Sequence, residues 1–129
     1  MDENITRNPA GTKGVGTFAV RDIESGELVY SFPRGRFVVG KDLASVAEAD
    51  KKWVDKIGPD TYEIIEPPAR YLNHSCDPNI LETDRVGYAL RDIKAGEEIT
   101  VDYEAIKYVG PAFECCCRSR NCRKRIPSQ

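Results

Sequence analysis

Short apolar and aromatic stretches, separated by glycines and charged turns, dominate the hydrophobic pattern of this chain. Two of these stretches match each other seventy positions apart, at residues 18–27 (FAVRDIESGE) and 88–97 (YALRDIKAGE). In each, aromatic and β-branched residues lead into a glycine turn and a short apolar run follows, which is typical of two strands joined by a turn. The shared Ala, Arg, Asp, Ile, Gly and Glu positions predict two equivalent corners of a sheet.

A helical pattern occurs at residues 42–57. Apolar residues recur there at near-helical spacing, Asp42 can cap the first turn, and Gly58-Pro59 ends the pattern. The pattern predicts one helix whose apolar stripe packs on the core. Elsewhere glycine and proline break the chain into short strands, so we expect a β-rich α+β fold with little helix.

The 129 residues, 40% of them hydrophobic, suit one compact domain with a single core. The chain has no apolar run of about 18 residues, and its N-terminus is polar and acidic. We therefore expect a soluble intracellular protein, cytoplasmic or nuclear, with no signal peptide or transmembrane segment. Gly110-Pro111 is the one plausible boundary, and it divides residues 1–110 from residues 111–129.

The formal net charge of −2 conceals an acidic body and a basic tail. Residues 113–129 carry five basic side chains against one acid, which leaves 14 basic and 20 acidic residues in the rest of the chain. An acidic surface can attract a basic peptide, whereas a short basic tail is more often a solvated end than a nucleic-acid site. We therefore expect a partner with a basic segment, and neither nucleic acid nor a membrane.

Four of the five cysteines crowd together near the C-terminus, which does not suit a disulfide framework. Cys115, Cys117 and Cys122 form a C-x-C-x4-C knuckle whose thiolates can reach one tetrahedral zinc ion. A zinc ion would fasten a tail that is too short to make a core of its own. The knuckle leaves the fourth ligand open among three donors: Cys76, which is the natural one, His74 and Cys116.

Four consecutive residues with polar or reactive side chains occur at Asn73-His74-Ser75-Cys76, and they include the only histidine of the chain. Asp77-Pro78-Asn79 follows them, and these residue types favour a tight turn. Such a turn would hold the preceding polar side chains rigidly at the end of a strand. Four polar side chains in a row are rarely all structural. The run therefore predicts a binding or catalytic site.

Two further features have both a functional and a structural interpretation. Gly14-Val15-Gly16 formally begins a G-x-G-x-x-A dinucleotide fingerprint, but no strand precedes it and no helix follows, so we reject that function. Its glycines still allow backbone to approach a small cofactor closely, although an ordinary tight turn has the same pattern. Tyr103 ends a strand, where a core tyrosine is the simpler interpretation of the residue alone.

In this order, the motifs resemble those of the SET-domain protein lysine methyltransferases. Four segments carry the resemblance: Gly14 to Gly16 matches the cofactor loop, Tyr71 to Asn79 the R-F-I-N-H-S-C-x-P-N motif, Gly96 to Tyr103 the G-E-E-L-T-x-D-Y motif, and Phe113 to Ile126 the zinc-binding post-SET segment. The resemblance implies a SET domain at residues 1–110 and a post-SET segment at 111–129. It also implies a fold of small β-sheets with a C-terminal pseudoknot. Arg118 and Cys116 depart from the usual knuckle.

The resemblance implies transfer of a methyl group from S-adenosylmethionine to a lysine of a protein, either histone-like, chromatin-like or cytosolic. A non-catalytic SET module that binds a protein partner is the alternative. Tyr103 would orient the reacting groups, Val101 stands where relatives tune the number of methyls added, and Cys76 becomes the expected fourth zinc ligand. The implied cofactor-binding residues are Gly14, Val15, Gly16, Tyr62, Asn73, His74 and Phe113, and either Tyr108 or Phe113 would close the channel.

Overall fold

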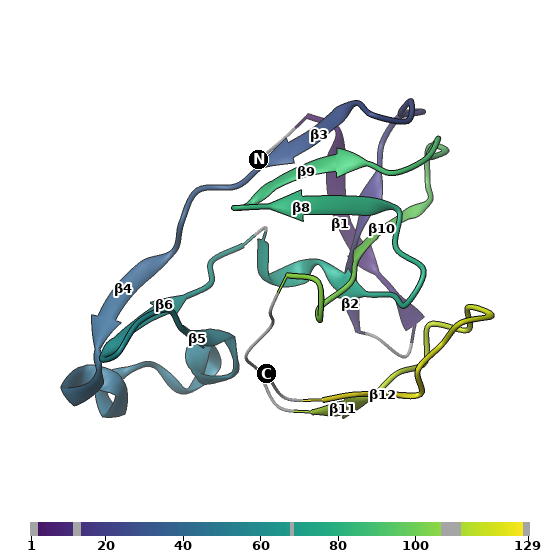
Figure 1. The fold of residues 1–129 in the computed structure, drawn as a ribbon. Coiled ribbons are helices and arrows are strands. Elements are labelled where there is room, and N and C mark those ends of the chain that lie inside the picture. The colour runs from purple at the N-terminus through teal and green to yellow at the C-terminus, as the bar shows by residue number, and fades with distance from the viewer. Residues whose placement is uncertain (1–2, 12–13, 68, 107–111, 128–129) are drawn as a thin grey trace.

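The computed structural model describes residues 3–11, 14–67, 69–106 and 112–127, and it is built almost entirely from short strands (Figure 1). The strands fall into three small sheets and a C-terminal hairpin. None of the helices in these ranges is long and apolar enough to cross a bilayer. The strand-rich class predicted from the broken hydrophobic pattern is confirmed.

The first sheet has the order β1-β2-β10-β7, and its strands are β1 (Ile5–Pro9), β2 (Val15–Ala19), β10 (Glu98–Val101) and β7 (Asn73–His74). Three of its strands are antiparallel neighbours, but β7 runs parallel to β10, with Asn73 beside Thr100 and His74 beside Val101. This parallel pair brings together two motifs that lie far apart in the sequence. It is the local reason why the polar run at Asn73 lies next to the residues that follow β10.

The other strands complete the outer parts of the molecule. The second sheet is β3-β9-β8, formed by β3 (Leu28–Ser31), β9 (Val86–Ala89) and β8 (Ile80–Thr83). The third is β4-β6-β5, formed by β4 (Arg36–Val39), β6 (Thr61–Ile64) and β5 (Val54–Lys56). The hairpin of β11 (Phe113–Glu114) and β12 (Arg125–Ile126) lies on the opposite side of the molecule from the second sheet (Figure 1).

The two matching segments form equivalent corners that pack on each other, as their sequences predict. Ile23 and Ile93 exchange both backbone hydrogen bonds at 2.8 Å, and their side chains are 2% and 1% exposed. Each corner also donates one turn amide to the aspartate of the other corner, at 2.9 Å in both cases: Ser25 to Asp92 and Ala95 to Asp22. The interactions repeat with the seventy-residue offset of the sequence, so the corners are related by an approximate two-fold axis.

The core lies under these corners and between the first two sheets. Its members are twelve buried apolar residues, namely Ile5, Ala19, Ile23, Val29, Tyr30, Phe32, Leu72, Ile80, Ala89, Ile93, Ile99 and Val101. Tyr103 and Ile106 pack against the edge of this cluster. The residues after β10 are therefore supported on one side by the core, which fixes where Tyr103 can lie.

The helix predicted at residues 42–57 is wrong. The segment contains two 3-10 helices, η2 (Gly40–Ser45) and η3 (Glu48–Trp53), separated by an extended Val46 and followed by strand β5. Asp42 makes no cap, and neither 3-10 helix contains a buried residue. The apolar residues that suggest a helical stripe are divided between different elements, because Val54 pairs with Ile64 of β6 and takes its hydrogen bonds from a sheet. Tertiary pairing overrides a weak local pattern here. A third short 3-10 helix, η4 (Ala69–Tyr71), precedes β7.

Candidate functional site

Tyr103 lies at the centre of the candidate site, two residues beyond the end of β10. Its hydroxyl group donates a hydrogen bond to the carbonyl oxygen of Leu72, and its backbone N–H donates to Nδ1 of His74 at 3.0 Å. Its ring meets those of His74 and Phe113 edge-on, with ring centroids 5.4 and 5.9 Å away. Backbone, hydroxyl group and ring are therefore all held, so the phenol has a defined direction.

His74 is 6% exposed, and both of its ring nitrogens have partners. Because Nδ1 accepts the Tyr103 amide, Nε2 carries the proton, and Nε2 lies 3.3 Å from the sulfur of Cys76. A neutral imidazole held in this way has no nitrogen directed to a substrate. His74 thus serves as a link between Tyr103 and Cys76, and the arrangement does not suit a general base.

Asn73 connects the glycine loop to the end of β10. Its side-chain NH2 group donates to the carbonyl oxygen of Val15 and to the carboxylate of Glu98, each at 2.9 Å. A Cβ atom on Gly16 would lie 2.6 Å from Oε2 of Glu98 and 3.1 Å from Nδ2 of Asn73, so only glycine fits against this pair. Both amide hydrogens are used within the protein, and the side chain holds the residues 14–16 loop beside β7.

Two cavities meet at Tyr103, which lines both of them. The smaller cavity, about 240 Å³, is lined by Asn73, His74, Tyr103, Phe113 and residues 114–117. The larger, about 510 Å³, is lined by both apolar and charged residues, and Leu72, Val101, Tyr103 and Ile106 are among them. A group bound in one cavity could therefore meet a group bound in the other at the Tyr103 side chain. This is the geometry that a transfer between two bound molecules needs.

Two of the charged residues that line the larger cavity, Arg34 and Arg85, are held by Glu63, whose carboxylate is completely buried. Arg34 and Arg85 contact it at 3.1 and 3.0 Å, and the backbone N–H of Gly35 donates to it at 2.6 Å. Burial by itself would raise the pKa of Glu63, but these hydrogen bonds and the two guanidinium groups outweigh burial and lower it. Burial raises the pKa of the neighbouring Asp55 carboxyl group.

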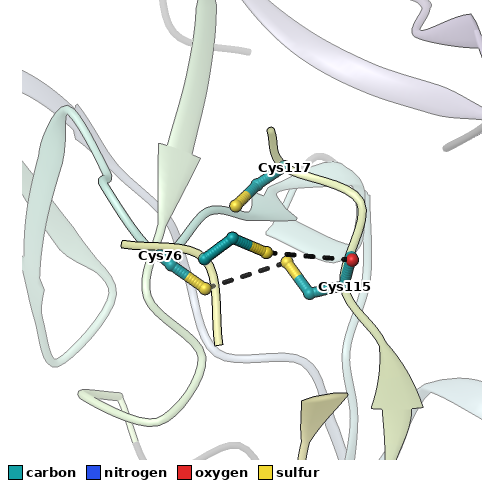
Figure 2. A group of neighbouring side chains, drawn as sticks. Cys76, Cys115 and Cys117 are labelled. Atoms are coloured by element: carbon teal, nitrogen blue, oxygen red, sulfur yellow. Dashed lines mark hydrogen bonds between the residues drawn. The ribbon is translucent and has the colours of Figure 1, made fainter. Parts of the chain in front are cut away.

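The four cysteines expected to bind zinc are brought together, although Cys76 is 39 residues from Cys115 in the sequence. Their sulfurs all lie within 4.8 Å of one another, and the Cys76 and Cys115 sulfurs are 3.8 Å apart. Figure 2 shows the sulfurs of Cys76, Cys115 and Cys117 directed toward one point. Four such sulfurs, one from Cys76 and three from the C-terminal segment, match the donor set of a structural zinc site. Cys116 is exposed and lines the smaller cavity, and it is not one of the four.

Without a metal, the thiols of this cluster differ in acidity. Burial raises the pKa of the Cys115 thiol to about 12. Burial acts in the same direction on Cys117, but hydrogen bonds with Ser119 outweigh it and lower the pKa to about 5. The lowered pKa of Cys117 favours its thiolate, which is the form that a metal binds, whereas burial favours the protonated form of Cys115.

The remaining residues predicted for the site differ in their position relative to the two cavities. Tyr62 lies in β6, paired with Val38 and Lys56, and it lines neither cavity, so its expected cofactor contact remains a prediction without support from this geometry. Tyr108 and the Gly110-Pro111 boundary lie outside the described residues. Phe113 lines the smaller cavity beside Tyr103.

The site also contains partners that the motifs alone do not reveal. They include Glu98, which fixes Asn73, and Arg123, which contacts both Cys76 and the residues on each side of Tyr103. The one signal of Arg123 in the sequence is its position directly after the ligand candidate Cys122. A cationic side chain at this position can offset the negative charge of the thiolate ligands.

The strand-rich fold places Tyr103 between two cavities and beside a cluster of four cysteines that could hold a metal ion. The profile of the SET domain matches residues 14–104, and the chain belongs to this family. The match spans the glycine loop, the Asn73 motif and Tyr103. The resemblance seen in the motifs is confirmed.

The names of similar proteins mention either the SET domain or a methyltransferase activity. The chain is 35% identical, over 84% of its length, to the variant-silencing SET domain-containing protein of Plasmodium falciparum (isolate 3D7). It is 44% identical, over 43% of its length, to the histone-lysine N-methyltransferase Set2 of Drosophila melanogaster. The chain spans only 5% and 3% of the length of these two proteins.

One solved structure extends the likeness to three dimensions. The crystal structure of KRYPTONITE in complex with mCHG DNA and SAH superimposes with a TM-score of 0.66 at 26% sequence identity. The superposition covers 95% of this chain and 28% of that chain. The likeness in fold therefore extends over nearly the whole chain, and the similar protein was crystallised with SAH.

Proposed function

We propose that this protein is a protein-lysine N-methyltransferase that uses S-adenosylmethionine. The observation that carries the proposal is the position of Tyr103 between two cavities, because the reaction needs a lysine amine and a methyl donor to approach from opposite sides. The relatives named as histone-lysine N-methyltransferases support this activity. SAH, which accompanies the similar structure, is S-adenosylmethionine without its methyl group.

The smaller cavity suits the cofactor, which supplies the methyl group. Phe113 and His74 would provide aromatic and backbone contacts, and the loop of Gly14, Val15 and Gly16 would run along one side, since Asn73 holds that loop in place. We propose that the Asn73 side chain acts through this loop, because both of its amide hydrogens already have acceptors. Cofactor contact would come from the backbone of β7.

The larger cavity suits the lysine side chain, because the apolar residues Leu72, Val101 and Ile106 line it together with Tyr103. Only a neutral amine can attack, and a reference pKa near 10.4 makes deprotonation at pH 7 cost roughly 4 to 5 kcal/mol. Apolar walls lower an amine pKa by disfavouring its charged form. Tyr103 donates a hydrogen bond to the carbonyl oxygen of Leu72, and its hydroxyl oxygen would accept a hydrogen bond from the amine and orient it.

The cysteine cluster suits one zinc ion with Cys76, Cys115, Cys117 and Cys122 as ligands. A zinc ion here would be structural, because all four coordination positions would be filled by protein sulfur. It would fasten β11 and β12 beside Tyr103. Phe113 would then be fixed as a wall of the cofactor cavity.

We propose a substrate with a basic segment around the target lysine, because residues upstream of 113 carry 20 acidic against 14 basic side chains. Histone tails have this chemistry, and two of the relatives act on histones by name, so a chromatin location is our working proposal. Ribosomal or other cytosolic proteins with basic tails are the competing substrates. Val101 is small and lines the lysine cavity, which favours addition of more than one methyl group.

The test is transfer of radiolabelled methyl from S-adenosylmethionine to purified histones and to fractionated lysate proteins, followed by mass spectrometry of the labelled lysine. We expect label on lysine of a basic protein, more than one methyl at saturation, and loss of label after zinc is stripped. Measurable cofactor binding without label on any acceptor would contradict the enzymatic proposal and favour a partner-binding module. A product that stays strictly monomethylated would contradict the argument from Val101.

A further inference from the structure

Three hydrogen-bond donors surround the sulfur of Cys76. Nε2 of His74 lies at 3.3 Å, the backbone N–H of Arg123 at 3.3 Å, and Nε of Arg123 at 3.4 Å. Four thiolates around a divalent zinc ion leave a net negative charge, which N–H donors and a guanidinium group stabilise. Cys76 is also the only one of the four ligand candidates that lies outside the C-terminal segment. It is therefore the ligand candidate through which a zinc ion would join the tail to the rest of the domain.

The guanidinium group of Arg123 has two further partners, and they flank Tyr103 in the sequence. Nη2 contacts Asp102 at 2.9 Å and Nη1 contacts Glu104 at 2.6 Å. Asp102 in turn accepts the backbone N–H of Glu104 at 3.0 Å, which closes the turn that carries Tyr103. Every guanidinium nitrogen therefore has an acceptor, and one side chain reaches both the metal ligand and the turn.

His74 makes a second, parallel connection between the same two places. Its ring joins the Cys76 sulfur at Nε2 to the Tyr103 amide at Nδ1. Two connections that end at the same sulfur and on the same turn restrict both translation and rotation of Tyr103. A loose turn would lose alignment, and displacement by about 1 Å can cost about 100-fold in rate.

We infer that Arg123 is a positioning residue that, together with His74, transmits the order of the zinc site to Tyr103. Loss of the metal would release Cys76, and the Tyr103 turn would lose both of its lateral supports at once. Arg123 acts through Asp102 and Glu104 and makes no contact with the reacting groups. This inference rests on the proposed zinc site and methyl transfer, but two of its readouts require neither a substrate nor turnover.

The test compares Arg123→Gln with Arg120→Gln, which removes the same charge from an exposed position of the same segment. We expect Arg123→Gln to release zinc to a chelator about 10 to 100 times faster than the wild type. Hydrogen exchange of residues 102–106, followed by mass spectrometry, should be faster as well. The kcat should fall at least tenfold, with a much smaller change in cofactor affinity and in the KM for the substrate protein. Arg120→Gln should match the wild type in all five measurements.

A second variant separates the two ends of the connection and protects the test against a folding defect. Glu104→Gln keeps the contacts of Arg123 with Cys76 and weakens only one contact with the turn. It should speed exchange at residues 102–106 and leave zinc release unchanged. The inference is overturned if Arg123→Gln and Arg120→Gln have the same zinc release and the same exchange. A wild-type protein without methyl transfer would remove the proposed function, while zinc release and exchange would still decide the role of Arg123.

Discussion

The paired corners and the C-terminal tail are both small, but they are held together in opposite ways. The corners place Ile23 and Ile93 in the core and exchange backbone hydrogen bonds that repeat with the same offset as the sequence. The tail has a hairpin whose strands are two residues long, and among its described residues only Ile126 is a fully buried apolar residue. In our proposal, a zinc ion bound by four sulfurs holds the tail in place, as burial in the core holds the corners. The difference teaches that Tyr103 lies where a frame with its own core meets a segment that, on our proposal, depends on a zinc ion for its position.

Removal of the metal is the strongest way to break the comparison. Chelation or Cys115→Ser should abolish methyl transfer and expose residues 113–126 to rapid exchange, since structural zinc is worth on the order of 10 kcal/mol to the segment it folds. The corners at residues 19–27 and 89–97 should stay protected, because their hydrogen bonds do not involve the cluster. Hydrogen exchange mapped by mass spectrometry measures both effects. Cys116→Ser is the matched control, and it should retain one zinc ion per chain. Global unfolding on chelation would show that the frame does not support itself.

Glu63→Gln tests the frame at a site far from the metal cluster. Its buried carboxylate compensates Arg34 and Arg85, so its loss should cost about 3 to 5 kcal/mol in the free energy of unfolding at pH 7. Because its pKa is lowered in the folded state, Glu63 stabilises the fold above its unfolded pKa of about 4.3 and loses that contribution as the pH falls through the folded value.

Denaturant melts of the wild type and Glu63→Gln between pH 7 and pH 2 should therefore converge as the pH falls. Zinc stoichiometry at pH 7 should be equal in the two proteins. A difference in stability that stays constant across this range would contradict the ionised role of Glu63.

Two glycines that carry the same motif should respond differently to alanine. Gly16→Ala places a methyl group against the Asn73 and Glu98 side chains, and overpacking of this kind costs about 1 to 3 kcal/mol. Gly14→Ala meets open space and costs only about 1 kcal/mol of backbone strain, at a φ of 81°. Calorimetric SAH binding should weaken more in Gly16→Ala than in Gly14→Ala. Equal loss of affinity in both would mean that the loop is not held through Asn73.

The smallest expected effect tests the symmetry of the corners directly. Ile23→Val and Ile93→Val should each lower the free energy of unfolding by about 1 kcal/mol, because each removes one methylene group from an equivalent buried position. The exposed Ile57 gives the matched control, and Ile57→Val should change little. Equilibrium denaturation measures all three. A large inequality between the two corner variants would show that the repeat is symmetric in its contacts but not in its energetics.

Part of this architecture can be predicted from the sequence because the information is local. The shared residues of the corners predict their equivalence, and the close spacing of Cys115, Cys117 and Cys122 predicts a shared ion. The helix at residues 42–57 fails because the competing partner of Val54 is Ile64, which no local pattern reveals. The apolar residues of the predicted stripe are instead divided among two 3-10 helices, strand β5 and the residues beside them.

The contacts around Tyr103 were beyond prediction for a different reason. The role of Arg123 depends on the tail folding back so that one side chain reaches Cys76, Asp102 and Glu104 at once. Spacing within the sequence carries no such information. The use of both Asn73 amide hydrogens likewise depends on Glu98 and Val15, which come from two other strands.

The most direct measurement of the central claim is the kcat of Tyr103→Phe beside that of Tyr62→Phe, with zinc content and cofactor affinity measured in both. Tyr103→Phe removes one hydroxyl group from the point where the two cavities meet, and Tyr62→Phe removes one from a strand that lines neither. We predict at least about a 100-fold fall in kcat for Tyr103→Phe, with zinc and cofactor binding retained, and a wild-type rate for Tyr62→Phe. A Tyr103→Phe protein that transfers methyl at the wild-type rate would contradict this account.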